Sequence, residues 1–214
     1  MSFKLFTLLV QASGWTIVIS LTSIVLGLAL GTVVAALMQS GQGLLSFVGR
    51  TFVSFFRGAP LLVQLLLIYN LLPVLGLNVP SMVAAIVGLS LCTAAYQAEN
   101  LRGGFASVPR GALEAADMLG LTPVQQFWRI RAPIALRMTL PALTNEAIMI
   151  LKASSLVSVV GVVELTRMAQ DLSASTFRPL PLFATAALLY LIINSGVAFA
   201  AKRLENAFRW GVKA

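Results

Sequence analysis

The sequence contains long stretches without a single charged residue, and these constrain its fold more than any other feature. Residues 15–38, 58–77, 79–98 and 179–201 hold no Asp, Glu, Lys or Arg. A helix needs about 20 predominantly apolar residues to cross the hydrocarbon core of a bilayer, and only helices and closed barrels satisfy their backbone there. The four stretches therefore predict an all-α integral membrane protein.

The composition agrees with this prediction and excludes several kinds of site. Of the 214 residues, 58% are hydrophobic and 10% are charged, whereas a typical soluble domain has about 25% charged residues. Cys92 is the only cysteine and the sequence has no histidine, so we expect no intrachain disulfide and no metal site of the usual Cys/His type. The first 14 residues show no clear cleavage site, and no removable signal peptide is expected.

A fifth apolar segment carries charges. Residues 136–163 are long enough to cross a membrane, but they include Arg137, Glu146 and Lys152. Such a segment fits only as an interrupted or cavity-facing helix, because charged side chains are costly in lipid. We therefore predict one transmembrane domain, residues 1–214, with five spans. These spans cover about residues 14–38, 52–73, 79–101, 135–158 and 180–203.

The basic residues predict how the chain is oriented. Most Lys and Arg residues fall in three segments, 39–57, 102–137 and 202–214, whereas the opposite ends of the spans hold few. Because positively charged loops stay in the cytoplasm, these three segments are predicted to be cytoplasmic. The N-terminus is then outside and the C-terminus inside, which agrees with an odd number of spans.

The central polar segment, residues 107–133, has the signals of two short helices joined by a tight turn. The sequence before Gly120 is rich in residues that favour helices, and Gly120 can adopt the left-handed conformation that ends a helix. Thr122 is a suitable N-cap for the next helix, and Gln125 completes a capping box. Val124, Phe127 and Trp128 are spaced i, i+3 and i+4, which places them in one apolar stripe of a helix. A capped, amphipathic loop of this kind indicates a docking element.

The same segment has a characteristic spacing. The tripeptide EAA at 114–116 is followed by three residues and Gly120, then by nine residues and Ile130, then by one residue and Ala132-Pro133. This resembles the EAA loop of ABC importer permeases, with Ala132 in place of the usual Leu. Residues 55–73, 95–111 and 140–167 are similar to three further motifs of one group. The chain thus resembles, over residues 14–210, the polar amino acid uptake group of bacterial ABC permeases.

This resemblance implies a fold and an assembly. The fold is the five-helix permease of type I importers, with the coupling helix–turn–helix between the third and fourth spans. The expected partners are a second permease subunit, identical or homologous, two cytoplasmic ATPase subunits that bind ATP and Mg, and a periplasmic or lipid-anchored amino acid binding protein. The chain itself has no GxxxxGK[ST] loop, so we expect a transporter subunit without catalytic residues or cofactors, in the bacterial plasma membrane and without nucleic acid.

Two sets of site residues follow. The residues that resemble the ATPase-coupling positions are Glu114, Ala115, Ala116, Gly120 and Leu121. The residues predicted to line the substrate path, because polar groups at membrane depth are costly and often functional, are Asn145, Glu146, Lys152, Ser154, Ser155, Gln64 and Tyr96. Glu146 is suited to an ammonium group, and the two serines to a carboxylate or side chain.

Each of these assignments has a structural alternative. Glu146 and Lys152 can neutralise each other, the serines can bond back to their own helix, and Gln64 and Tyr96 can form bonds between helices. Glu99 and Arg102 are spaced to pair as a tie or gate, and Arg57 is suited to anchoring at a lipid surface. The family often has Asp where this chain has Ala153, which disfavours a strongly basic substrate.

Two other functions were weighed against the importer. A secondary transporter would use Glu146 and Lys152 as an ion-coupling pair, but five spans without a visible inverted repeat count against it. A membrane enzyme is disfavoured because the sequence has no histidine and no carboxylate pair with catalytic spacing.

Overall fold

The computed structural model describes residues 3–208, and this part of the chain is helical without a strand. The elements are α1 (Phe3–Met38), α2 (Gly43–Gly58), α3 (Leu61–Val74), α4 (Ser81–Ala106), α5 (Arg110–Met118), α6 (Pro123–Gln126), the π-helix η1 (Phe127–Arg131), α7 (Ala132–Ala153), the 3-10 helix η2 (Ser154–Val160), α8 (Leu165–Thr176) and α9 (Pro179–Phe208). Two basic residues used for the predicted orientation, Arg209 and Lys213, lie outside the described residues.

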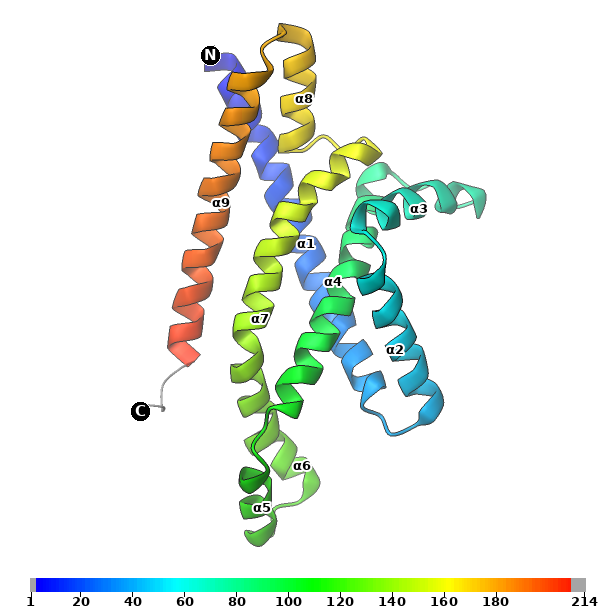
Figure 1. The fold of residues 1–214 in the computed structure, drawn as a ribbon, viewed down its shortest axis with the longest axis vertical. Coiled ribbons are helices and arrows are strands. Elements are labelled where there is room, and N and C mark those ends of the chain that lie inside the picture. The colour runs from blue at the N-terminus through cyan, green and yellow to red at the C-terminus, as the bar shows by residue number, and fades with distance from the viewer. Residues whose placement is uncertain (1–2, 209–214) are drawn as a thin grey trace.

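Four helical segments are long and apolar enough to cross a membrane. They are α1, α4, the continuous run Pro123–Val160 and the run Pro179–Ala207. A fifth crossing is formed if α2 and α3 are taken together, although the two helices are bent by 109° at the short break between them. In Figure 1, α3 runs sideways from the bundle, whereas α1, α4, α7 and α9 run along it.

The break between α2 and α3 differs from the straight span that the sequence predicted at residues 52–73. Helix α2 begins nine residues earlier and ends at Gly58. Pro60 is the reason, because proline disfavours the helical conformation of the residue before it. Ala59 accordingly has φ −92° and ψ 142°, and Pro60 becomes the N-cap of α3. If α2 and α3 form the predicted second crossing together, that crossing is a broken helix.

The side chain of Gln64 closes this break. Its Nε2 donates hydrogen bonds to the carbonyl oxygens of Phe56 and Ala59, both at 2.8 Å. Carbonyls freed at a helix end need partners in a membrane, and a buried amide supplies them here. The bend is thus held by a specific contact and is not simply a loose joint.

Helix α1 packs along α4 through two glycines. A Cβ atom on Gly27 would lie 2.6 Å from Cβ of Thr93, and one on Gly31 would lie 2.8 Å from the carbonyl oxygen of Ala94. Both distances are too short for any larger residue. The GxxxG motif therefore brings two helices of the same chain together, as such motifs do in membranes.

Helix α1 also takes part in all three apolar cores. One core joins it to α2 and α4, another to α3, α4 and η2, and the third to α8 and α9. Its contributions are Val34 and Ala35, Ile19, and Leu9, respectively. Association of helices in lipid depends on close van der Waals packing, so α1 is the element around which the bundle is assembled.

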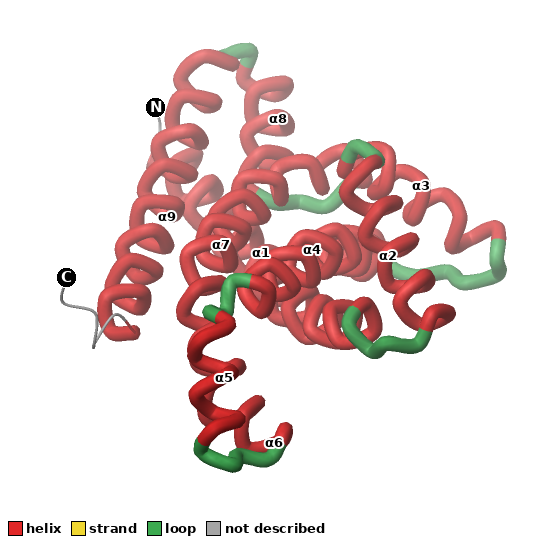
Figure 2. The backbone as a smooth tube through the Cα atoms, turned by 60° about the horizontal axis from the view of Figure 1, so that its bottom comes forward, coloured by secondary structure: helices red, strands yellow, loops and turns green. Residues whose placement is uncertain are grey.

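Helices α5 and α6 project from one end of the bundle, as Figure 2 shows. Helix α5 follows α4, while α6 continues without interruption through η1 into α7. The predicted helix–turn–helix is therefore unequal. Its first helix is a separate short element, and its second is the beginning of a membrane-crossing helix.

Candidate functional site

The turn after α5 is closed by backbone hydrogen bonds that require a glycine. The amide of Gly120 donates to the carbonyl oxygen of Asp117 at 2.9 Å, and the amide of Leu121 donates to that of Ala116 at 3.1 Å. This pair of bonds is a Schellman motif, whose αL position is usually glycine. Gly120 has φ +68°, a conformation that side chains with a Cβ rarely adopt. The predicted stop at Gly120 is confirmed.

The start of α6 is capped as the sequence predicted. The amide of Gln125 donates to Oγ1 of Thr122 at 3.3 Å, and the amide of Thr122 donates to Oε1 of Gln125 at 3.0 Å. Pro123 occupies the first helical position, where its missing N–H costs nothing. The two helix ends that meet in this loop therefore satisfy their own backbone groups.

Two side chains hold the loop in place, Gln126 by contacts within the loop and Phe127 by a contact with α4. Nε2 of Gln126 donates to Oδ1 of Asp117 and to the carbonyl oxygen of Leu121, the latter at 3.1 Å. The ring of Phe127 stacks on that of Phe105 in α4, with 5.8 Å between centroids and an interplanar angle of 11°. Helix α5 is thus joined to α6, and the start of η1 is joined to α4.

The loop exposes several large apolar side chains among its polar ones. Met118, Leu119, Val124 and Trp128 are 91%, 77%, 67% and 69% exposed. Of the predicted coupling residues, Glu114, Ala115 and Gly120 are exposed, Leu121 is half-buried and Ala116 is buried. An exposed apolar patch on a rigid element is typical of an interaction surface. Ala116 therefore supports this surface from below instead of forming part of it.

The predicted substrate-path residues within the apolar segment 136–163 lie along α7 and η2. Lys152 and Asn145 are exposed, Glu146 is half-buried and Ser154 is buried. Among the described residues, Glu146 and Lys152 do not form an ion pair with each other or with any other group. Ser154 and Ser155 donate to the carbonyl oxygens of Leu151 and Lys152, at 2.8 and 2.9 Å. The serines thus have partners within their own helix, whereas the two charged residues do not.

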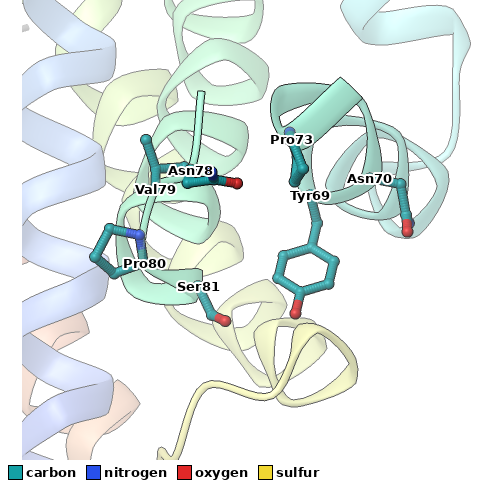
Figure 3. Close-up of a pocket in the computed structure, with 7 residues that line it drawn as sticks. All are labelled: Tyr69, Asn70, Pro73, Asn78, Val79, Pro80 and Ser81. Atoms are coloured by element: carbon teal, nitrogen blue, oxygen red, sulfur yellow. The ribbon is translucent and has the colours of Figure 1, made fainter. Parts of the chain in front are cut away.

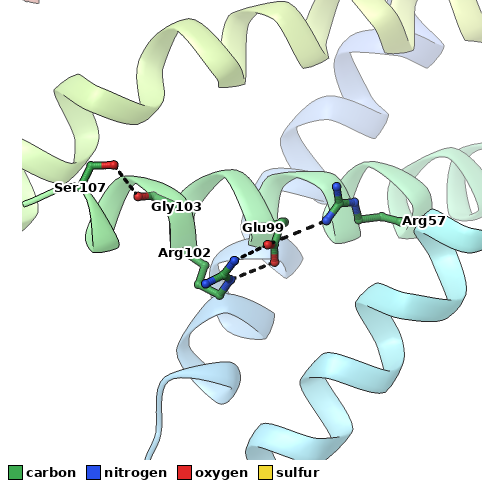
Figure 4. A network of polar contacts seen from close by, with 5 residues as sticks. All are labelled: Arg57, Glu99, Arg102, Gly103 and Ser107. Carbon is green, nitrogen blue, oxygen red and sulfur yellow. Dashed lines mark hydrogen bonds and ion pairs between the residues drawn. The ribbon is translucent and has the colours of Figure 1, made fainter.

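A second polar group lies beside the α2–α3 break (Figure 4). Nε of Arg102 donates to Oε2 of Glu99 at 3.0 Å, and Nη2 of Arg102 donates to Oε1. The tie that the sequence predicted between these residues is therefore present. Nη1 of Arg57 lies 4.0 Å from Oε1 of Glu99, and its guanidinium carbon lies 5.3 Å from the centroid of the Tyr96 ring. Arg57 thus contacts α4 on one side while part of its side chain stays exposed, and its expected role as a lipid anchor stays a prediction.

Sequence reasoning missed Glu164. This residue is fully buried, in the connection between η2 and α8, and its carboxylate accepts four hydrogen bonds. The donors are the amides of Thr166 and Arg167, both at 2.9 Å, the hydroxyl of Tyr190 at 2.8 Å and Oγ1 of Thr16 at 3.4 Å. Burial raises the pKa of the Glu164 carboxyl, and the hydrogen bonds oppose that rise. The residue caps α8 and joins it to α1 and α9.

An open depression of about 480 Å³ lies at the end of α3. Figure 3 shows the residues that line it, which come from the end of α3 and the connection to α4. They are Tyr69, Asn70, Pro73, Asn78, Val79, Pro80 and Ser81. None of the predicted substrate-path residues is among them, so this depression is separate from the polar groups described above.

The fold defines a class, a helical membrane protein with a short helical loop that projects from one end of the bundle. Comparison with known proteins gives the family. Residues 23–210 match the binding-protein-dependent transport system inner membrane component, and the chain belongs to this family. It is therefore a multi-pass inner membrane component of a transport system and not an enzyme, and the family resemblance seen in the motifs is confirmed.

Individual relatives and solved structures agree with this family assignment. The chain is 39% identical over 201 residues to the octopine transport system permease protein OccM of Rhizobium meliloti, covering 88% of this chain and 80% of that protein. It is 34% identical to the glutamine transport system permease protein GlnP of Escherichia coli K12, covering 94% and 93%. A crystal structure of an amino acid ABC transporter with histidines matches with a TM-score of 0.89 and 32% identity over 94% of both chains. The MetNI methionine ABC transporter in an inward-facing conformation, at 24% identity and a TM-score of 0.81, shares the fold over 97% of this chain and 99% of its own.

Proposed function

We propose that this chain is one of two permease subunits of an ATP-driven importer that carries a polar amino acid across the bacterial inner membrane. The observation that carries the proposal is the closed, exposed apolar loop between α4 and α7. Such a loop has no evident role in a transporter made of one chain, but it suits a subunit whose conformational change is driven by a bound partner. The relatives named above are permeases for octopine and glutamine, which supports an amino acid or a derivative of one as the substrate.

The coupling residues act through the continuity of the helix that follows them. The exposed residues Glu114, Ala115 and Gly120 meet a groove on an ATPase subunit, which binds ATP and Mg, while Ala116 and Leu121 support them from below. When the ATPases close, the loop moves as one body, because its helix ends and the Gln126 contacts hold it together. The displacement passes through η1 into α7, which carries Glu146 and Lys152. This is rigid-body switching between two packed states.

The remaining partners follow from the same proposal. A second permease subunit, identical or homologous, completes the path, and an amino acid binding protein, periplasmic or lipid-anchored, delivers the substrate from outside. The distribution of basic residues supports an N-terminus outside and a C-terminus in the cytoplasm. The loop then lies on the same side as the ATPases.

The residue at position 153 bears on which amino acid is carried. An acidic side chain next to Lys152 would pair with a cationic substrate, and this chain has Ala153 instead. We therefore infer a neutral polar or acidic amino acid. Competition between labelled amino acids for uptake tests this, and exclusive uptake of arginine or lysine would contradict it.

Cross-linking tests the proposed contact with the ATPase. Cys92 is the only cysteine and is buried, so a Cys92→Ala background leaves engineered thiols as the only reactive ones. Ala115→Cys should cross-link to the ATPase subunit in the assembled transporter. Ser40→Cys, exposed in the α1–α2 turn on the same predicted side, is the matched control and should not. Absence of a cross-link from position 115 in an actively transporting complex would rule out the proposed docking.

Dependence on ATP separates the importer from a secondary transporter. Proteoliposomes that contain the permeases, the ATPases and the binding protein should accumulate amino acid only with ATP. Collapse of the ion gradients with ionophores should leave this uptake intact. Uptake that follows the ion gradient without the ATPases would favour the secondary transporter instead.

A further inference from the structure

Helix α2 presents an exposed stripe of mixed chemistry on its outer face. Figure 1 shows α2 at the edge of the bundle, and its opposite face, at Gly49 and Val53, is buried against α1 and α4. Residues three and four positions apart share one face of a helix. The exposed residues at this spacing line an open depression of about 470 Å³, and they form the α2 stripe: Phe47, Arg50, Thr51, Ser54 and Phe55.

The three polar side chains of the α2 stripe have no partner among residues 3–208. The guanidinium of Arg50 forms no ion pair there, and the hydroxyls of Thr51 and Ser54 form no hydrogen bond. Hydroxyls on the neighbouring helix α1 do bond to their own helix, as Thr32 does to the carbonyl oxygen of Leu28 at 2.8 Å. A guanidinium has five N–H donors and each hydroxyl has one, so the stripe gathers several free donors in one place.

Aromatic rings flank these donors on both sides. Phe47 is 66% exposed and Phe55 is 53% exposed. The Phe55 ring contacts the Phe56 ring edge-on, with 5.1 Å between centroids and an interplanar angle of 85°. Phe56 in turn packs against the apolar core that joins α2 to α1 and α4. The ring of Phe55 is therefore held in place beside the donors, and a molecule bound there meets polar and apolar groups together.

The order of these groups along α2 matches the layers of a bilayer leaflet. With the orientation proposed above, α2 begins on the cytoplasmic side, at Gly43. Arg50 follows after about 10 Å of helix, and Phe55 lies about 7 Å deeper. Side chains tilt toward the N-terminus of their helix, so Arg50 tilts back toward the cytoplasmic headgroups, as long basic side chains near helix ends do. Free donors at headgroup level with a ring below them match the two parts of a phospholipid.

The charges of this region favour an anionic headgroup over a zwitterionic one. Helix α2 contains no acidic residue. Glu99, which approaches α2 from α4, is already paired with Arg102 through both carboxylate oxygens. The ammonium group of a zwitterionic headgroup therefore has no free carboxylate to bind here. A phosphate without an ammonium group suits the stripe, because arginine binds phosphate through two parallel hydrogen bonds.

We propose that the α2 stripe binds an anionic phospholipid of the cytoplasmic leaflet. Its phosphate accepts hydrogen bonds from Arg50, Thr51 and Ser54, and an acyl chain lies against Phe55. The inference goes beyond the proposed function, because neither the transported amino acid nor the ATPase takes part in it. Its test measures lipid binding, so it can fail or succeed independently of amino acid uptake.

Photo-cross-linking in proteoliposomes tests the proposal. The full chain, with the subunits that copurify with it, is placed in phosphatidylethanolamine that contains a trace of photoreactive phosphatidylglycerol, and the labelled residues are identified by mass spectrometry. The segment 47–55 should be labelled, and an excess of unlabelled phosphatidylglycerol should remove the label. Arg50→Gln should lower the labelling of this segment by about tenfold, as expected for loss of a charge-assisted contact with phosphate.

Two further variants separate a built site from a general attraction of lipid to basic residues. Arg137→Gln is the matched control, because Arg137 is also exposed on a crossing helix of the predicted cytoplasmic side but does not line the depression. It should leave the labelling of 47–55 unchanged. The Thr51→Val/Ser54→Ala double variant keeps the charge and removes the two hydroxyls, and it should lower the labelling by about fivefold.

Three results would overturn the proposal. Equal labelling of 47–55 by photoreactive phosphatidylethanolamine would show that the stripe makes only ordinary contact with the bilayer. Unchanged labelling in Arg50→Gln would show that the arginine does not hold the headgroup. A disulfide between two copies of a Ser54→Cys/Cys92→Ala variant would show that a second copy of the chain covers this face. If Arg50→Gln does not elute as the wild type does in size-exclusion chromatography, the hydroxyl double variant decides between these outcomes and the proposal.

Discussion

The coupling loop and the α2–α3 break are both interruptions between helices, but they are built in opposite ways. In the loop, the turn at Gly120, the capping box at Thr122 and the Gln126 contacts supply partners to polar groups at both helix ends. At the break, the backbone is equally well closed by Gln64, but Arg57 beside it lacks a full partner. The loop is thus closed by contacts within itself, whereas the break leaves one charged side chain only partly paired.

The largest expected effect comes from opening the closed turn. Gly120→Val forces a β-branched residue into the αL conformation, at a cost of about 1–2 kcal/mol or more, and should disrupt the Schellman turn. Uptake should fall by about tenfold or more, while the partner ATPases continue to hydrolyse ATP. Gly111→Val is the control, since a Cβ at either glycine meets open space but only Gly120 has positive φ. Equal uptake by the two variants would show that the closed turn is not needed.

A second prediction concerns Glu164, a buried residue whose carboxylate accepts four hydrogen bonds, whereas Arg57 is only partly paired. Glu164→Ala removes the acceptor of two hydroxyl and two amide donors. Leaving buried donors unpaired costs about 1–3 kcal/mol, so thermal unfolding in detergent should occur at a clearly lower temperature. Asp171→Ala in the same helix removes only an exposed ion pair with Arg167 and should change stability by less than about 1 kcal/mol. Similar losses would mean that Glu164 does not join the helices.

A third prediction sharpens the role of rigidity in the loop. Gln126→Ala removes the contacts of α6 with Asp117 and Leu121, each worth about 1 kcal/mol. The loop should dock normally but transmit motion less faithfully. We therefore expect more ATP to be hydrolysed per amino acid transported, by a factor of about two to five. Gln170→Ala, at an exposed position of α8, should leave this ratio unchanged, and an unchanged ratio in Gln126→Ala would remove the case for bracing.

The smallest effect is expected from the cap of α6. Thr122→Ala removes the acceptor for the amide of Gln125, at a cost of about 1 kcal/mol. Hydrogen exchange at that amide should become about fivefold faster, with little change in uptake. Thr7→Ala provides the comparison, because the Thr7 hydroxyl bonds only to its own helix at Phe3. Unchanged exchange at Gln125 would show that Pro123 alone begins the helix.

Features set by neighbours in the sequence were predictable. The stop at Gly120, the capping box and the pairing of Glu99 with Arg102 depend on residues at most a few positions apart, and each was predicted. The apolar segment 136–163 was expected to form an interrupted or cavity-facing helix, and it changes from α7 to a 3-10 helix at Ser154. Pro141, in contrast, lies inside α7 without ending it.

Features set by distant residues were not predictable. The partners of Glu164 include Thr16, 148 positions away, and no local pattern indicates such a contact. The contacts of Arg57 with Glu99 and Tyr96 of α4 were not predicted, because the break beside Arg57 was not recognised, although Pro60 was a signal for it. The GxxxG motif that begins at Gly27 is a local pattern, but only the structure shows that α4 of the same chain packs against it.

The helical run from Pro123 to Val160, which continues through a π-helix and a 3-10 helix, has a mechanical consequence. With 38 residues, it is roughly 57 Å long at a rise of 1.5 Å per residue. Rotated by about 10° around its foot, a rod of that length swings its far end through roughly 10 Å, more than the width of an amino acid. If the ATPases displace the foot of this run, as proposed above, a small displacement there is geometrically sufficient to move its other end by that distance.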